Sequence, residues 1–180
     1  MSPRLRPAHE ADFPAVAALY GREVLEGTAT FEETPPSVED MLARWRAVQD
    51  KGLPWLVAEV DGAFAGYAYL SPFRPRAAYR YAVEVSIYVA ADAQGRGVGR
   101  ALLQALIDHA RVAGLRHLIG AISQSASSDA SIGLHRALGF ELAGVYRQVG
   151  WKFGRWLDVT LMQLDLNPAG AAPASEGLTL

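Results

Sequence analysis

Cysteine is absent from the 180-residue chain. Its absence excludes a thiol nucleophile, a thiolate zinc site, an iron–sulfur cluster and a disulfide framework, and it fits a reducing compartment. Lysine is scarce and occurs only at Lys51 and Lys152, so nearly all basic side chains are arginine. The formal net charge of −2 implies no broad cationic surface, which argues against nucleic acid as a main partner.

Long apolar runs are also lacking. No stretch is long enough to cross a bilayer, so we expect no membrane partner and a cytoplasmic location. What is present is typical of a globular protein, with 51% hydrophobic and 20% charged residues. We expect a single domain over residues 1–166. Because residues 167–180 are mainly small residues and proline, we expect a disordered C-terminal tail there.

Hydrophobic patterning predicts a mixed α/β fold. Apolar residues at helical spacing predict helices over residues 11–26 and 98–113, and a helix that begins at Ser37 and is ended by Gly52 and Pro54. A shorter helix is expected to begin at Ser128 or Asp129. Strands are expected over residues 3–6, 55–60, 63–70, 82–89, 117–122, 140–145 and 158–166. Asp61-Gly62 is typical of a hairpin turn. The strand–helix–strand order over residues 82–122 predicts one parallel strand pair.

The strand expected at residues 82–89 has two different faces. Alternate residues from Val83 to Val89 are apolar and suit a core, whereas Glu84, Ser86 and Tyr88 share the opposite face. A half-exposed strand would explain this pattern without any function. However, a strand that leads into a crossover helix usually lies inside a sheet, where both faces are covered. A glutamate there needs a partner or a function.

Three alternating glycines, Gly95, Gly97 and Gly99, stand between this strand and the next helix. Glycines let backbone N–H groups approach a ligand, and the first turn of a helix presents free N–H groups. The order strand, glycines, helix favours a phosphate site over a merely flexible turn. The spacing matches neither the G-x-G-x-x-G dinucleotide motif nor a P-loop, since Arg100 stands at the last glycine position and no lysine is nearby.

The segment QGRGVG at residues 94–99, which follows a strand and precedes a helix, resembles the acyl-CoA-binding motif Q/R-x-x-G-x-G/A of the GCN5-related N-acetyltransferases (GNAT). The segments WLVAEVDG, FRPRAAYR, VEVSIYV, SIGLHRALGF and VGWKFGRWLD resemble the phosphinothricin and methionine sulfoximine acetyltransferases of that superfamily. The resemblance covers about residues 4–166. It implies the GNAT fold, a central mixed β-sheet flanked by helices.

The resemblance also implies a reaction. Acetyl would pass from acetyl-CoA to the α-amino group of a small amino acid analogue of the phosphinothricin, methionine sulfoximine or methionine sulfone type. The transfer would be direct, in a ternary complex, with no metal, in a homodimer. Glu84 is the implied general base, acting through water, and the Val89 N–H the implied oxyanion donor. The implied coenzyme-binding residues are Ile87, Tyr88, Val89, Gly95, Arg96, Gly97, Val98, Gly99, Arg100, Ser128 and Ser131.

Substrate contacts are implied for the loop before the strand and for the strand itself, at Arg74, Pro75, Arg76, Glu84, Val85 and Ser86. The two arginines suit acidic groups, although plain surface exposure explains them equally well. Lys152 and Arg155 are further candidates for contact with the substrate or a partner subunit. We expect Trp151, Phe153 and Trp156 to be core or interface aromatics. His135 is expected to pack or to support a residue of the site, with a place beside the coenzyme A sulfur as the alternative.

Two departures from this interpretation stay open. One is an acetyltransferase that acts on another amine, such as a protein N-terminus or an antibiotic. The other is a module that senses acyl-CoA without turnover, although such a sensor has no use for a carboxylate at Glu84. Ser128 stands where the family often has asparagine, which leaves a direct bond to coenzyme A in doubt and favours a bridging water.

Overall fold

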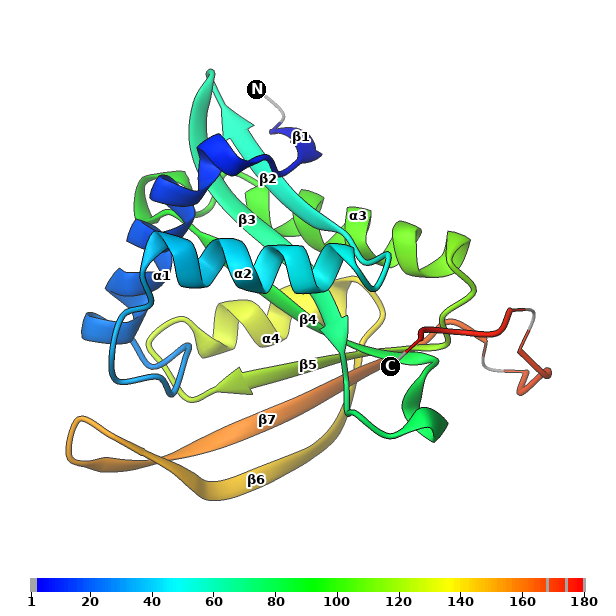
Figure 1. The fold of residues 1–180 in the computed structure, drawn as a ribbon. Coiled ribbons are helices and arrows are strands. Elements are labelled where there is room, and N and C mark those ends of the chain that lie inside the picture. Colours follow the sequence, from blue (N-terminus) through cyan, green and yellow to red (C-terminus); the bar gives the residue numbers. More distant parts are fainter. Residues whose placement is uncertain (1–2, 168, 174, 180) are drawn as a thin grey trace.

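The computed structural model describes residues 3–167, 169–173 and 175–179. These residues form a seven-stranded mixed sheet in the order β1-β2-β3-β4-β5-β7-β6 (Figure 1). The strands are β1 (Arg4–Pro7), β2 (Trp55–Val60), β3 (Ala63–Pro72), β4 (Ala82–Val89), β5 (His117–Ser123), β6 (Glu141–Lys152) and β7 (Arg155–Asp165). The helices are α1 (Phe13–Glu26), α2 (Val38–Gln49), α3 (Val98–Val112) and α4 (Ser128–Ala137), with 3-10 turns η1 (Glu10–Asp12), η2 (Ala77–Tyr79) and η3 (Ala91–Ala93).

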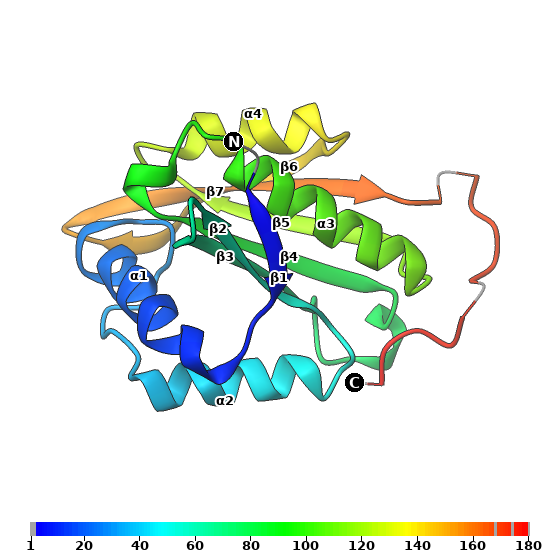
Figure 2. The same ribbon diagram turned by 90° about the horizontal axis from the view of Figure 1, so that it is seen from above.

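The helices form a layer on each face of the sheet. Figure 2 shows α1 and α2 on one face and α3 and α4 on the other. On the α1 and α2 side, the ring centroid of Phe13 lies 5.1 Å from that of Trp45 and 5.6 Å from that of Trp55. On the other side, α3 buries Leu102 and Leu106 completely. The predicted mixed α/β sheet with flanking helices is therefore confirmed.

The predicted hairpin turn, helix start and central strand in the N-terminal half are confirmed. Asp61 and Gly62 have φ angles of 54° and 80°, as a two-residue hairpin turn with both residues left-handed requires. The Ser37 Oγ accepts from Asp40 N at 3.1 Å, and the Asp40 carboxylate accepts from Ser37 N at 2.8 Å, so α2 begins with a capping box. β4 spans the predicted residues, and it pairs in parallel with β5.

The C-terminal hairpin is longer than the sequence predicts. β6 continues to Lys152, and β7 begins at Arg155. The turn between them consists of Phe153 and Gly154, whose φ angles are 51° and 71°. A phenylalanine in the left-handed region is an unusual turn residue, which is why the sequence does not signal a hairpin here. Trp151, Phe153 and Trp156 are 53–56% exposed, which excludes a core position and leaves the interface position of these aromatics as a prediction.

The segment expected to be a tail contacts the start of β4. The Tyr81 Oη donates to Ser175 O at 3.0 Å, and Leu178 N donates to Arg80 O at 2.9 Å. Residues 168, 174 and 180 lie outside the described residues. A single domain over residues 1–166 followed by a disordered tail over residues 167–180 stays a prediction, which limited proteolysis would test. Of the helices in the described ranges, none is long and apolar enough to span a membrane.

Candidate active site

The sheet opens between its two central parallel strands. β4 and β5 pair only from Ala82 opposite His117 to Val85 opposite Gly120. Beyond that point β4 continues along β3 as far as Val89, while β5 continues along β7 as far as Ser123. The two strands therefore diverge after Val85 and Gly120, and a gap opens in the middle of the sheet.

A cavity of about 570 Å³ occupies this gap. Its lining comes from both layers of the fold: α3 and α4 contribute on one face of the sheet, and α1 with the following loop contributes on the other, as the positions of these helices in Figure 2 indicate. The strand residues that line it are Glu84, Val85, Ser86, Ile87, Tyr88 and Val89 of β4 and Gly120, Ala121, Ile122 and Ser123 of β5. Residues from both layers of the fold therefore surround one cavity.

The glycine segment forms the end of the cavity that lies at α3. Gly95 and Gly97 have φ angles of 73° and 80°, and a Cβ at either position would meet no atom within 4 Å. Gly99 lies against α4, where a Cβ would come 3.2 Å from Leu134 Cδ2. The free N–H groups of the first turn of α3 therefore border open space beside Arg100, which also lines the cavity.

Backbone amides of β4 face the gap. Ala90 N donates to Ala65 O at 3.0 Å, and Phe73 N donates to Ala82 O at 3.2 Å, so even-numbered residues of β4 bond to β3. Because hydrogen-bonding groups alternate along a strand, the N–H groups of Ile87 and Val89 point the other way, into the gap. These amides, the open glycine turn and the size of the cavity suit the pantetheine arm and pyrophosphate of acetyl-CoA.

Glu84 is a partly buried carboxylate that lines the cavity. Within the described ranges, no side chain forms a hydrogen bond or an ion pair with it. Burial raises the pKa of the Glu84 carboxyl above its ordinary value of 4.5. Further along the same face of β4, Tyr88 stacks on Tyr67 at 5.1 Å between ring centroids and meets the ring of Tyr20 edge-on at 5.2 Å.

His135 lies at the inner end of the cavity, where β4 and β5 part. Its Nδ1 donates to Ser131 O at 2.8 Å, so its buried Nε2 is an acceptor, and it has no partner among the described residues. A Cβ on Gly120 would come 2.9 Å from that Nε2, so the glycine makes room for the imidazole. Burial lowers the pKa of His135, which favours the neutral ring. The ring also packs edge-on against Phe140.

Several residues expected at the site lie outside the cavity lining. Arg74, Pro75 and Arg76 belong to the exposed loop between β3 and η2, and the Arg74 guanidinium stacks on Phe73 and Tyr79, 5.0 and 5.7 Å from their ring centroids. Arg96 forms an ion pair with Asp61 at 2.8 Å. The Ser128 Oγ donates to Ser125 O at 2.9 Å. Of the expected residues, those that line the cavity are Glu84, Val85, Ser86, Ile87, Tyr88, Val89, Gly95, Gly97, Val98, Gly99, Arg100 and Ser131.

Some cavity residues come from distant segments and are not predicted from the sequence. Glu23 of α1 and Ala29 of the following loop line the cavity on the α1 face, and Ser125 and Ser127 line it after β5. No local motif marks Glu23, because it lies on a helix whose periodicity only predicts a core-facing stripe. Ser125 and Ser127 lie in a serine-rich run at residues 123–131, of which only Ser128 and Ser131 were expected at the site.

A sequence profile of the Acetyltransferase (GNAT) family matches residues 16–140. This chain belongs to the GNAT family. It is 50% identical over 163 residues to a phosphinothricin N-acetyltransferase of Alcaligenes faecalis, covering 91% of this chain and 82% of that protein. It is 46% identical to an L-methionine sulfoximine/L-methionine sulfone acetyltransferase of Pseudomonas paraeruginosa, covering 96% and 100% of the two chains.

The fold of this GNAT protein is also that of a solved relative. A GNAT superfamily phosphinothricin acetyltransferase from Sinorhizobium meliloti, in complex with AcCoA, superposes with a TM-score of 0.93 at 43% identity, covering 98% of this chain and 96% of that one. This chain is therefore an acetyl-CoA-dependent N-acetyltransferase. In the part of the chain that the structure describes, no cluster of three acidic or histidine side chains is placed to hold a metal ion.

Proposed function

We propose that this GNAT enzyme acetylates the α-amino group of a small amino acid analogue of the phosphinothricin, methionine sulfoximine or methionine sulfone type. The observation that carries this proposal is a partly buried Glu84, without a hydrogen-bond or ion-pair partner among the described side chains, in a cavity lined from both layers of the fold. The names of the relatives from Alcaligenes faecalis and Pseudomonas paraeruginosa supply the substrate class.

Acetyl transfer in this proposal is direct, within a ternary complex. Acetyl-CoA supplies the activated acetyl group. The first turn of α3, from Gly95 to Arg100, holds its pyrophosphate, and the N–H groups of Ile87 and Val89 hold the arm, with Val89 N–H facing the thioester oxygen. Glu84 takes the proton of the substrate ammonium through a water molecule. A raised pKa brings this carboxylate closer to the proton affinity that a base needs.

Substrate recognition in this proposal uses Glu84, Val85 and Ser86 together with the loop that carries Arg74, Pro75 and Arg76. This loop continues directly from β3, whose last residue, Pro72, pairs with Val83 of β4. Phe73 N then donates to Ala82 O at 3.2 Å, so the loop starts beside the first residues of β4, near Glu84. All candidate substrates carry an α-carboxylate, which is the group that we assign to these arginines. The loop therefore recognises what the candidates share and not what distinguishes them.

The charges that line the cavity favour one kind of side chain over the other. Among the described residues, the carboxylates in the lining are Glu23 and Glu84, and the guanidinium is that of Arg100 at the α3 end. A phosphinate side chain is anionic and is repelled by such carboxylates, whereas a sulfone or a sulfoximine is uncharged. We therefore expect methionine sulfone and methionine sulfoximine to be better substrates than phosphinothricin.

The enzyme is also proposed to work as a homodimer in the cytoplasm, where acetyl-CoA is available. β6 is an edge strand, and it carries large apolar side chains exposed to solvent, including Leu142 and Val149 at 56% and Trp151 at 53%. A second copy of the chain is the proposed occupant of this surface. Analytical ultracentrifugation should show a dimer that Trp151→Glu dissociates, and a wild-type monomer at micromolar concentration would contradict it.

A thiol-release assay with acetyl-CoA tests the substrate class. The panel contains phosphinothricin, methionine sulfoximine, methionine sulfone, a peptide with a free N-terminus and an aminoglycoside. We expect release of coenzyme A with the amino acid analogues and not with the last two. Release only with the peptide or the aminoglycoside would show that another amine is the acceptor. Calorimetric binding of acetyl-CoA without release in any mixture would indicate a sensor.

A further inference from the structure

Lys152 carries a buried positive charge that the proposed reaction does not use. It lies at the end of β6, its residue is 3% exposed, and it is not part of the cavity lining. Burial lowers the pKa of its ammonium group, and the nearby carboxylates of Glu23, Glu33 and Glu32 oppose that shift. Removing an ammonium ion from water is costly unless hydrogen bonds replace its hydration, so the partners of Lys152 indicate what it does.

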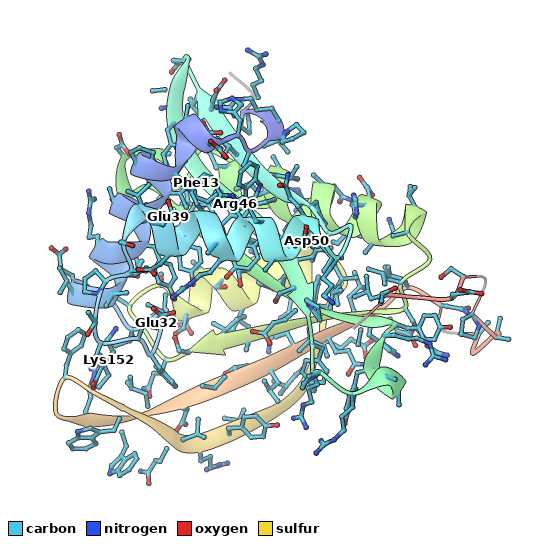
Figure 3. All side chains as sticks on the ribbon, in the orientation of Figure 1. Phe13, Glu32, Glu39, Arg46, Asp50 and Lys152 are labelled. Atoms are coloured by element: carbon cyan, nitrogen blue, oxygen red, sulfur yellow. The ribbon has the colours of Figure 1, made fainter. Side chains whose placement is uncertain are left out.

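Those partners are two backbone carbonyls at the end of α1 and in the loop after it. The Lys152 Nζ donates to Thr30 O at 2.8 Å and to Glu23 O at 3.4 Å, which joins segments 122 and 129 residues apart. Figure 3 shows Lys152 reaching from the tip of the β6–β7 hairpin toward this loop, on the same side as Glu32. A single ammonium group thus connects the hairpin to both ends of the segment 23–30.

The connected segment forms the cavity wall on the α1 face, since Glu23 and Ala29 line the cavity. A second attachment comes from β5, because Thr28 Oγ1 donates to Gln124 O at 2.6 Å. A third comes from β6, where the Phe31 ring lies so close to Gly150 that a Cβ on this glycine would overlap it. The position of the wall therefore depends on contacts with the C-terminal hairpin and the end of β5.

We propose that Lys152 is a positioning residue, which sets the wall of the acceptor side of the cavity by holding the carbonyls of Glu23 and Thr30. This inference rests on the proposed function in one respect, namely that the amine substrate enters from the α1 face. Among the described residues, no hydrogen bond joins Lys152 to the coenzyme side, which is built from β4 and the first turn of α3. Loss of Lys152 should therefore change one half of the cavity and leave the other unchanged.

Steady-state kinetics of Lys152→Met test this separation. The methionine keeps the chain length and removes both hydrogen bonds. We expect KM for methionine sulfone to rise by about tenfold or more, because small displacements of substrate-positioning groups have large effects, while KM for acetyl-CoA stays within about twofold of the wild-type value. Lys152→Arg, which can donate to both carbonyls, should recover part of the loss. The matched control is Lys51→Met, which removes the other lysine of the chain and should leave both constants unchanged.

Equal changes in the two KM values, or no change for the acceptor, would overturn the proposal. If Lys152→Met does not fold, Gly150→Ala displaces the Phe31 ring from the hairpin and should produce the same split. Failure of the proposed function is recognised separately, because wild-type enzyme would then release no thiol with methionine sulfone. In that case amide hydrogen exchange decides: Lys152→Met must accelerate exchange at residues 27–32 and not in α3, and unchanged exchange refutes the role of Lys152.

Discussion

The two walls of the cavity differ in how far apart in sequence their parts lie. The part proposed to hold acetyl-CoA, here called the coenzyme wall, is local, because β4, η3 and the first turn of α3 all lie between Ala82 and Arg100. The part proposed to face the amine substrate, here called the acceptor wall, joins α1, the loop after it and the end of β6, with one connecting hydrogen bond between residues 122 apart. A local wall can be conserved as a short sequence motif. A wall made by tertiary contacts can change, and with it the substrate preference, while that motif stays the same.

Glu84 lies between the two walls, and its removal should have the largest effect. We expect Glu84→Gln to lower kcat by about 10²-fold or more, because a positioned general base contributes about 10²–10⁴-fold. The substitution keeps size and polarity, so acetyl-CoA binding by calorimetry should be unchanged. Turnover equal to that of the wild type would remove Glu84 from the mechanism, and loss of acetyl-CoA binding would show that the variant had damaged the coenzyme wall.

A substitution in the local wall should affect only the coenzyme. Gly97 has a φ angle of 80°, which a β-branched residue tolerates poorly. We expect Gly97→Val to raise KM for acetyl-CoA by about tenfold. A valine in the left-handed region is strained by about 1–2 kcal/mol, and the backbone relieves this strain by turning its N–H group away from the coenzyme. KM for methionine sulfone should stay unchanged.

Gly52 provides the matched control for strain alone. It also has a positive φ, 68°, and open space around its Cβ position, but it lies after α2 and away from the cavity. Gly52→Val should reduce the free energy of unfolding to a similar extent and leave KM for acetyl-CoA unchanged. A rise in KM for acetyl-CoA in Gly52→Val as well would mean that general strain, and not the geometry of the glycine turn, explains the result.

The contrast between local and distant parts also explains what the sequence could predict. β4 and the glycine turn were predicted at their observed positions, since alternation and glycine spacing act within a few residues. Glu23 and Lys152 were not assigned their observed places, because their roles depend on which segments meet in three dimensions. The substrate role of the Arg74–Arg76 loop stays a prediction, since the chemistry of its arginines suits a carboxylate although the loop lies outside the cavity lining.

The pH dependence of the reaction should report the environment of Glu84. Burial raises its pKa, and the base works only when ionised, so kcat/KM should fall with decreasing pH around a value above 4.5. Stability gives an independent measure. A folded-state pKa above the unfolded value means that the folded protein binds more protons in the window between the two values, and stability from this group is lost as pH rises through the folded pKa.

Glu84→Gln removes this ionisation, so its Tm should exceed that of the wild type near neutral pH. The difference should shrink as pH falls through the window and vanish below the unfolded pKa of the carboxyl, because both proteins are then uncharged at this position. Differential scanning calorimetry across pH 4–8 measures it. A Tm difference that does not vary with pH would show that the pKa of Glu84 is the same in the folded and unfolded states.

The smallest effect should come from the distant wall, at Glu23. Its carboxylate packs over Gly27, where a Cβ would overlap it. Glu23 lines the cavity, and it forms no ion pair within the described ranges. We expect Glu23→Gln to raise kcat/KM for phosphinothricin relative to methionine sulfone by about two- to fivefold, because a partly exposed charge contributes about 0.5–1 kcal/mol. Competition assays with both substrates measure this ratio directly.

Glu26 is the matched control for Glu23, because it is an exposed glutamate on the same helix that does not line the cavity. Glu26→Gln changes the net charge equally and should leave the ratio unchanged. If both variants shift the ratio alike, long-range charge and not the acceptor wall sets the preference, and raising the ionic strength should abolish both shifts. If only Glu23→Gln shifts it, the choice between an anionic and a neutral side chain depends on a residue that the coenzyme motif does not include.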